Sequence, residues 1–126
     1  MKRGWIALLA LGIVLLIAAA ESLWISTNTG LYLNMLSEAD ERMATNDIEG
    51  AVSISERLDH RFNEQAGVYD LFLFHGEVLS ISKGLGAMHR YAQSGETAEF
   101  LAASMAVRRE LLSIRNTRTP AFGNIF

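Results

Sequence analysis

The feature that most constrains this chain is an unbroken apolar run near its N-terminus, residues 4–20, GWIALLALGIVLLIAAA. A segment that crosses a bilayer has to satisfy its own backbone hydrogen bonds, so a single run of this kind crosses as a helix. Spanning takes about 20 residues, with a lower limit of roughly 17. After Glu21 and Ser22, the residues 23–25 (LWI) extend the run. We therefore expect residues 1–25 to form a cytoplasmic tip and a transmembrane anchor.

The residues that flank the run predict its orientation. Lys2 and Arg3 precede it, and no further basic residue occurs before Arg42. Positive residues stay on the cytoplasmic side, which predicts a single-pass protein of the cell membrane with a cytoplasmic N-terminus and an extracytoplasmic C-terminal domain. Tryptophan favours both membrane interfaces. The expected anchor residues are Trp5, Leu8, Leu9, Ile13, Leu16 and Trp24.

The same segment is also compatible with a cleaved signal peptide. Three alanines, residues 18–20, stand before Glu21 and fit the small-residue pattern of a cleavage site. On this interpretation a secreted or released helical ligand-binding domain begins after Ala20. The apolar residues 23–25 favour a retained anchor, because they continue the apolar stripe beyond the cleavage site.

Composition limits what the remaining part can be. About 100 residues follow the anchor, which corresponds to one small domain. Cysteine is absent, so disulfides, thiolate nucleophiles and cysteine metal sites are excluded. Residues 31–107 carry twelve acidic and five basic side chains, whereas residues 108–126 carry four arginines and one glutamate. An acidic body argues against nucleic acid as a partner.

Apolar spacing of three and four residues predicts an all-α fold with helices over 31–44, 47–65, 68–93 and 97–114. The only proline, Pro120, follows the last of these segments. Residues 26–30 are polar and form either a hinge or a turn of one long helix. Helices joined by short turns pack as an antiparallel bundle. The expected architecture is an N-terminal transmembrane helix followed, over residues 31–126, by a small antiparallel bundle of about four helices in two hairpins.

Local signals mark several helix boundaries. Asn46 and Glu49 have the spacing of a capping box, and Gly67 is expected to end the second helix. Gly84 and Gly86 lie inside the third helix, where each costs about 1 kcal/mol relative to alanine. They permit a kink or a close helix crossing. The two polar turns before the second and fourth helices hint at a duplicated hairpin of tetratricopeptide-like type.

Few residues suggest chemistry. His75 and Glu77 are two positions apart, so on a helix they point about 200° apart and form no metal pair by themselves. We expect them to form a buried polar site, with His75 bonded to a neighbouring helix and Glu77 paired with an arginine. The spacing of His60, His75 and His89 matches no zinc signature, and residues 38–41 are expected to be a solvated acidic face. The sequence predicts no enzyme, cofactor or metal centre.

The C-terminal part suggests a contact surface. In an antiparallel bundle the last helix returns to the membrane, where each arginine near anionic headgroups contributes up to about 1 kcal/mol. The alternative is that the arginines complement the helix dipole while the tail packs back on the bundle. The candidate contacts with lipid or a partner are Arg108, Arg109, Arg115, Arg118, Phe122, Asn124, Ile125 and Phe126.

Particular motifs point to a family. They are Trp24 after the anchor, Asn46-Asp47 with Ala51 at the first turn, FLFHGEV at residues 72–78 and the terminal residues 124–126, NIF. With them the chain resembles, over nearly its whole length, a bacterial family, mostly from Firmicutes, catalogued as domain of unknown function 4363. It departs from the family at Gly84 and Gly86, and at Tyr69, where the family often has tryptophan.

The resemblance implies a short basic N-terminus, one membrane helix, a small helical domain and a membrane partner. We therefore expect a non-catalytic binding or accessory subunit of a membrane complex. Its expected contacts are membrane lipid and either another membrane protein or a second copy of the chain.

Overall fold

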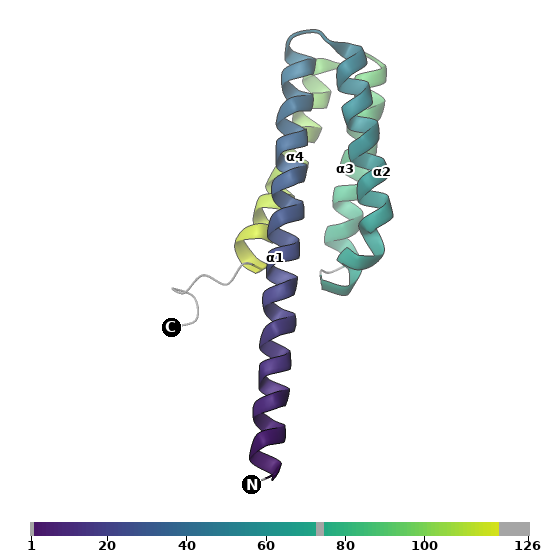
Figure 1. The fold of residues 1–126 in the computed structure, drawn as a ribbon. Coiled ribbons are helices and arrows are strands. Elements are labelled where there is room, and N and C mark those ends of the chain that lie inside the picture. Colours follow the sequence, from purple (N-terminus) through teal and green to yellow (C-terminus); the bar gives the residue numbers. More distant parts are fainter. Residues whose placement is uncertain (1, 73–74, 119–126) are drawn as a thin grey trace.

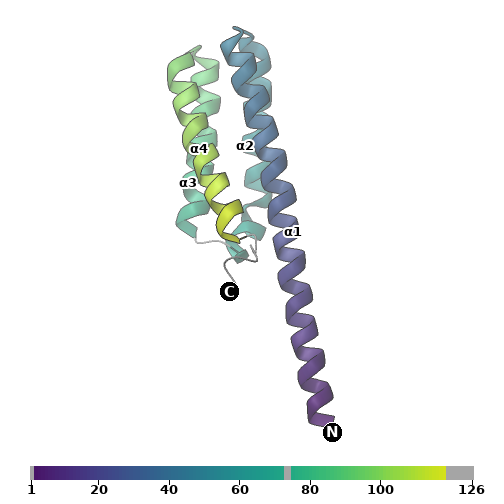
Figure 2. The ribbon, with the colours of Figure 1, turned by 90° about the vertical axis from the view of Figure 1, so that its left-hand side faces the viewer.

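The computed structural model describes residues 2–72 and 75–118, and within these ranges it confirms an all-helical fold (Figure 1). The four helices are α1 (Lys2–Ala44), α2 (Ile48–Phe72), α3 (His75–Gln93) and α4 (Thr97–Arg118). α1 packs against α2 and α4, and α3 packs against the same two helices. Figures 1 and 2 show consecutive helices running in opposite directions, so the four form an antiparallel bundle.

α1 is one continuous helix that contains the apolar run in its first half and packs in the bundle with its second half. Its N-terminal half protrudes from the bundle (Figure 1). The first buried side chain of α1 is Ile25. Residues 26–30 are helical, so they are a turn of one long helix and the predicted hinge is absent. Asn28 and Thr29 are buried in this segment, so the polar turn packs inside the bundle. The bundle thus has four helices only when the second half of α1 is included.

The turn between α1 and α2 is capped differently from our expectation. Asn46 adopts a left-handed conformation with φ 64°, which asparagine tolerates better than most residues. The helix cap is Asp47, whose Oδ1 accepts a hydrogen bond from the Gly50 N–H at 3.1 Å. Arg42 donates to the other carboxylate oxygen at 2.7 Å, and this bond, followed by the Gly50 N–H, lowers the pKa of Asp47. The predicted capping box from Asn46 to Glu49 is therefore wrong: the cap is Asp47, and Gly50, three residues later, has no side chain to complete a capping box.

α2 passes through Gly67 and ends at Phe72, so the predicted stop at Gly67 is wrong. The reason is Tyr69, whose side chain is almost completely buried. A glycine in a helix costs about 1 kcal/mol, whereas burying a large apolar side chain contributes about 1.5–3 kcal/mol. Residues 68–72 consequently belong to α2, and α3 starts at His75 rather than at Val68.

The first hairpin, α1 with α2, matches the second, α3 with α4, when residue numbers are shifted by 49. This match supports the duplicated hairpin that the turns suggested. Asn46 and Gly95 occupy the same place in the two turns, with φ 64° and 69°. Five buried positions of α1 match five of α3: Thr29 and Val78, Tyr32 and Ile81, Leu36 and Leu85, Ala39 and Met88, Met43 and Ala92. Because α1 also packs against α4, the hairpins close into a bundle and do not stack as an open solenoid.

The two glycines of α3 have different roles. A Cβ atom built at Gly84 would lie 2.5 Å from Cγ2 of Val107, so α3 and α4 cross closely there. The nearest atom to a Cβ at Gly86 is the Arg90 guanidinium nitrogen at 3.5 Å, an ordinary contact. Of the two glycines, only Gly84 therefore provides the close helix crossing that the sequence permitted. Neither glycine interrupts α3, which is helical throughout His75–Gln93.

Candidate functional site

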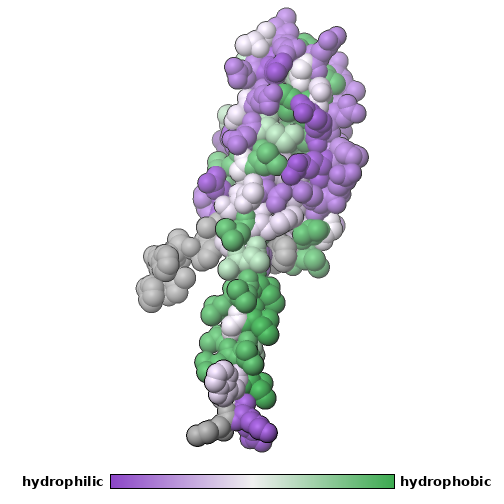
Figure 3. Space-filling view, viewed as in Figure 1, coloured by the Kyte–Doolittle hydropathy of each residue, from purple (hydrophilic) through white to green (hydrophobic). Residues whose placement is uncertain are grey.

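The protruding part of α1, residues 2–20, in which every side chain is exposed, is called the stalk below. Its large apolar side chains from Trp5 to Ile17 are between 56% and 71% exposed, and the most apolar stretch has no buried residue. The helix is long and apolar enough to span a membrane. Figure 3 shows it as an apolar rod below a mostly polar bundle. The predicted anchor residues Trp5, Leu8, Leu9, Ile13 and Leu16 all lie on this exposed part.

Trp24 differs from the other predicted anchor residues, because it packs into the bundle. Its ring lies 4.8 Å from that of Tyr69, which stacks on Phe62 at 5.2 Å. Tyr32 meets Phe62 edge-on at 5.9 Å, and the Arg61 guanidinium lies 6.0 Å from the centre of the Tyr32 ring. This aromatic cluster joins α1 to α2 in the half of the bundle nearest the stalk.

A chain of partly buried polar groups runs beside the aromatic cluster. The Tyr32 hydroxyl donates to Gln65 Oε1 at 2.6 Å, and the Gln65 amide donates to Asn28 Oδ1 at 3.3 Å. The Asn28 amide in turn donates to the Trp24 carbonyl at 2.9 Å. Burial raises the pKa of Tyr32 to about 12, against an opposing effect of Arg61, so its hydroxyl remains a donor at neutral pH. These pairs hold α1 and α2 in one register.

Two buried hydroxyls in the same region, those of Thr29 and Tyr69, have no hydrogen-bond partner among the described residues. Burial, followed by the neighbouring Tyr32, raises the pKa of Tyr69. Both side chains are almost fully buried. Because an unpaired buried hydroxyl costs free energy, this half of the bundle combines strong packing with incompletely satisfied polar groups.

The predicted arginine group does not gather at one place. Arg108 donates to Ser37 at 3.2 Å and to Asp40 at 3.1 Å, so it ties α4 to α1. Asp40 lies 20 residues beyond Ala20 on α1, a distance of about 30 Å at 1.5 Å per residue. A lipid contact near the stalk does not fit this position.

The other predicted contact residues also lie at different places along α4 or outside the described residues. Arg109 donates to the Met105 sulfur at 3.6 Å on the outer face of α4. Arg115 is exposed nearly two turns further along α4, in the direction of the stalk. The side chain of Arg118 and the tail residues Phe122, Asn124, Ile125 and Phe126 lie outside the described residues.

His75 and Glu77 do not form the buried site that we expected. His75 is the first residue of α3 and its side chain is 78% exposed, because it lies at the end of the bundle. Its Nδ1 is 3.3 Å from Asp70 Oδ1 on α2, so it does contact a neighbouring helix. Glu77 is half-buried, and one of its carboxylate oxygens is buried with no partner among the described residues, an arginine included.

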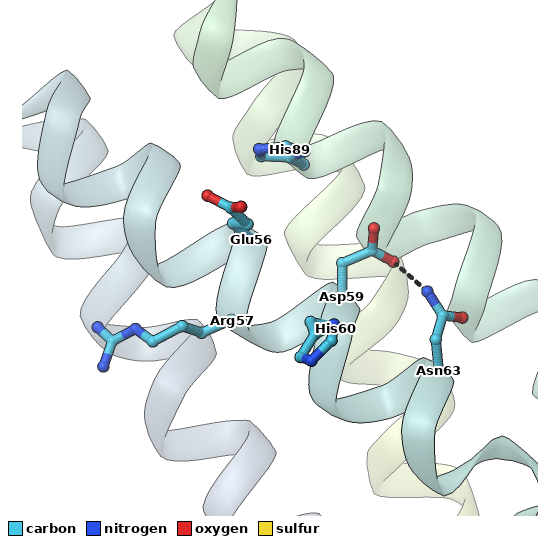
Figure 4. Close-up of a pocket in the computed structure, with 6 residues that line it drawn as sticks. All are labelled: Glu56, Arg57, Asp59, His60, Asn63 and His89. Carbon is cyan, nitrogen blue, oxygen red and sulfur yellow. Dashed lines mark hydrogen bonds between the residues drawn. The ribbon is translucent and has the colours of Figure 1, made fainter.

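A polar surface groove lies between α2 and α3 (Figure 4). Asp59 accepts a hydrogen bond from Asn63 at 3.1 Å, and His60 lies 2.9 Å from Glu64. The part of the chain that the structure describes contains no group of three histidine or acidic side chains placed to hold a metal ion. The groove is open, and its side chains Asp59, His60 and Asn63 contact neighbours on α2 itself, so it is best described as a solvated face. Its lining residues are Glu56, Arg57, Asp59, His60, Asn63 and His89.

Sequence reasoning missed an apolar surface at the end of the bundle nearest the stalk, called the basal end below. It is formed on α2 by Val68 and Leu71, which are 40% and 78% exposed. The signal was present in the sequence, because Leu58, Phe62 and Tyr69 continue one helical stripe through Gly67. Following that stripe would have assigned Val68 and Leu71 to the outer face of α2.

Over residues 2–72 and 75–118, the fold and this geometry define a helical-bundle protein with one candidate membrane helix near its N-terminus. Comparison with family models, with curated proteins and with solved structures gave no match. The resemblance to the domain of unknown function 4363 family stays a prediction from the sequence motifs.

Proposed function

We propose that this chain is a single-pass membrane protein whose bundle acts as a non-catalytic binding or accessory subunit of a membrane complex. The observation that carries the proposal is the continuity of α1 over Lys2–Ala44. A helix without a break transmits position and orientation, so the bundle stands at a set height on the bilayer. Such an arrangement suits a protein that presents a surface to a neighbour in the same membrane.

The proposed topology follows from charge. Lys2 and Arg3 remain on the cytoplasmic side, and the bundle, in which acidic residues exceed basic ones, lies outside the cytoplasm at the cell membrane. The proposed partners are membrane lipid along the stalk and another membrane protein, or a second copy of this chain, along the bundle. Nucleic acid does not suit the acidic bundle.

The alternative function is a released ligand-binding bundle that begins at Glu21. All buried positions of α1 lie at or beyond Ile25, so cleavage after Ala20 would leave the bundle's packing positions in place. The retained anchor is favoured because Leu23, which is 69% exposed, continues the apolar surface of the stalk beyond the cleavage site.

The test is the native mass and composition of the full-length protein, extracted from its own membrane in mild detergent. A stoichiometric second protein, or a defined homo-oligomer, is the expected result. A lone full-length chain would contradict the accessory-subunit proposal. A chain that begins at Glu21 would instead establish the released form.

A matched pair of variants tests whether the continuous helix matters. Ser22 lies on α1 between the stalk and the first buried residue, Ile25. Ser22→Pro removes a backbone donor and kinks the helix, whereas Ser22→Ala leaves it straight. We expect the proline variant to stay in the membrane with a folded bundle but to lose its partner, while the alanine variant keeps it. Equal retention of the partner by both would show that the rigid connection is not required.

A further inference from the structure

Two apolar side chains in the last turns of α2 are left uncovered by the bundle. Leu71 is 78% exposed, more than any other large hydrophobic side chain of the described residues, and Val68 is 40% exposed. Figure 3 shows apolar side chains at the basal end beside the apolar stalk. A single exposed leucine is ordinary on a protein surface, but these two continue a larger apolar surface.

The register between α1 and α2 sets the height of Leu71. Tyr69 packs on Trp24, and Gln65 is hydrogen-bonded to Asn28. Since the helices are antiparallel, these two pairs place Leu71 opposite position 22 of α1. That level is about 3 Å along the helix axis from Ala20, the last residue of the apolar run. The end of α2 therefore stands at the height where the apolar stalk begins.

An almost entirely apolar groove lies between the two helices at this height. It is lined by Ile17, Ala20, Glu21, Trp24 and Val68. One wall is the stalk itself, so whatever fills the groove lies alongside the segment proposed to cross the bilayer. Lipid acyl chains run in that direction and surround any membrane-spanning helix.

We infer that the basal end of α2 inserts into the membrane interface, and that this groove holds the upper part of a lipid acyl chain. The inference rests on the proposed function, because it requires the stalk to lie in a bilayer. The neighbouring polar side chains Asp70 and His75 lie 3.3 Å apart and contact each other, and Glu21 lies at the edge of the groove. Insertion thus leaves these three polar side chains at headgroup depth, where polar groups are tolerated.

The chain contains no cysteine, so single-cysteine variants carry a spin label at one chosen position. We would compare Leu71→Cys with Leu16→Cys on the stalk and with Met105→Cys on α4, whose side chain is 54% exposed. The full-length variants would be placed in nanodiscs of a neutral phosphatidylcholine. For each label, we would compare its accessibility to oxygen, which partitions into lipid, with its accessibility to a water-soluble nickel complex.

We expect the labels at Leu71 and Leu16 to be more accessible to oxygen, and the label at Met105 to be more accessible to nickel. A label at Leu71 that behaves like that at Met105 would overturn the inference and leave the anchor intact. A Leu71 label shielded from both reagents would also overturn it, because a protein surface then covers the site. If the Leu16 label is accessible to nickel, the proposed function fails as well.

Occupancy of the groove has a separate readout. The chain has two tryptophans, so Trp5→Phe leaves Trp24, which lines the groove, as the only one. Lipids brominated near the headgroup end of the acyl chain should quench its fluorescence. In this background Ala20→Leu fills the groove and should reduce the quenching, whereas Ala19→Leu, outside the groove lining, should not. Equal quenching in the two variants would show that no acyl chain occupies the groove.

Discussion

Replacing Gly84 by alanine should destabilise the bundle, whereas the same replacement at Gly86 should stabilise it. Both glycines lie within α3, where alanine gains about 1 kcal/mol of helix propensity. A Cβ at Gly86 meets only the flexible end of Arg90 at 3.5 Å. Most of the propensity gain, about 0.5–1 kcal/mol, should therefore appear as stability in Gly86→Ala.

At Gly84 the new methyl group meets a stiff neighbour. It would lie 2.5 Å from Cγ2 of Val107, which is 1% exposed and, as a β-branched residue in a helix, has one strongly preferred rotamer. Overpacking of this kind costs about 1–3 kcal/mol. Subtracting the propensity gain leaves a net loss of roughly 1 kcal/mol for Gly84→Ala.

Thermal unfolding of the full-length protein in mild detergent, followed by far-UV circular dichroism, separates the two variants. A change of 1 kcal/mol shifts the Tm of a domain of this size by about 4–8 °C. We expect a rise for Gly86→Ala and a fall for Gly84→Ala. The double variant Gly84→Ala with Val107→Ala should be more stable than the sum of its single changes predicts. If Gly84→Ala raises the Tm as much as Gly86→Ala, the close crossing of α3 and α4 is refuted.

Further substitutions examine the contacts that join α1 to its neighbours. Tyr32→Phe removes the hydroxyl that donates to Gln65, and should cost about 1 kcal/mol in the same melting experiment. The pKa of Tyr32 is raised from 10.0 to about 12, so its neutral hydroxyl stabilises the fold up to pH 10 and this contribution is lost as the pH rises towards 12. Between pH 10 and 12 Tyr32→Phe should therefore lose less stability than wild type, and an equal loss would contradict the raised pKa of Tyr32. The pKa of Asp47 is lowered, chiefly by Arg42, so its charge stabilises the fold above an unfolded-state pKa of about 3.9 and less at lower pH. The Tm difference between wild type and Asp47→Asn should accordingly shrink as the pH falls below about 4, whereas a constant difference would exclude a role for the charge. Arg108→Ala, which breaks the ion pair between α4 and α1, should lower stability by about 1 kcal/mol, and an unchanged Tm would show that the pair contributes nothing.

The sequence by itself determined the all-helical fold class and the position of the apolar run. An apolar run of 17 residues and the three-four spacing that follows are local properties, and both appear in the structure as helix. The turns before Ile48 and Thr97 were also located correctly, because short polar segments interrupt the periodic pattern there. Even the duplication of the hairpin was visible as a repeated turn, although its 49-residue shift became clear only from matching buried positions.

Only the tertiary structure decided where α2 ends and what the basal end presents. Gly67 is a plausible helix stop in isolation, since its cost of about 1 kcal/mol is not offset by local contacts. It is offset by the burial of Tyr69 against Trp24, a residue 45 positions earlier in the chain. The same packing carries Leu71 to the level of the stalk, while the contact with Asp40 turns Arg108 towards α1. Such choices depend on which surfaces meet, because a marginal local preference yields to the larger free energy of burial between distant segments.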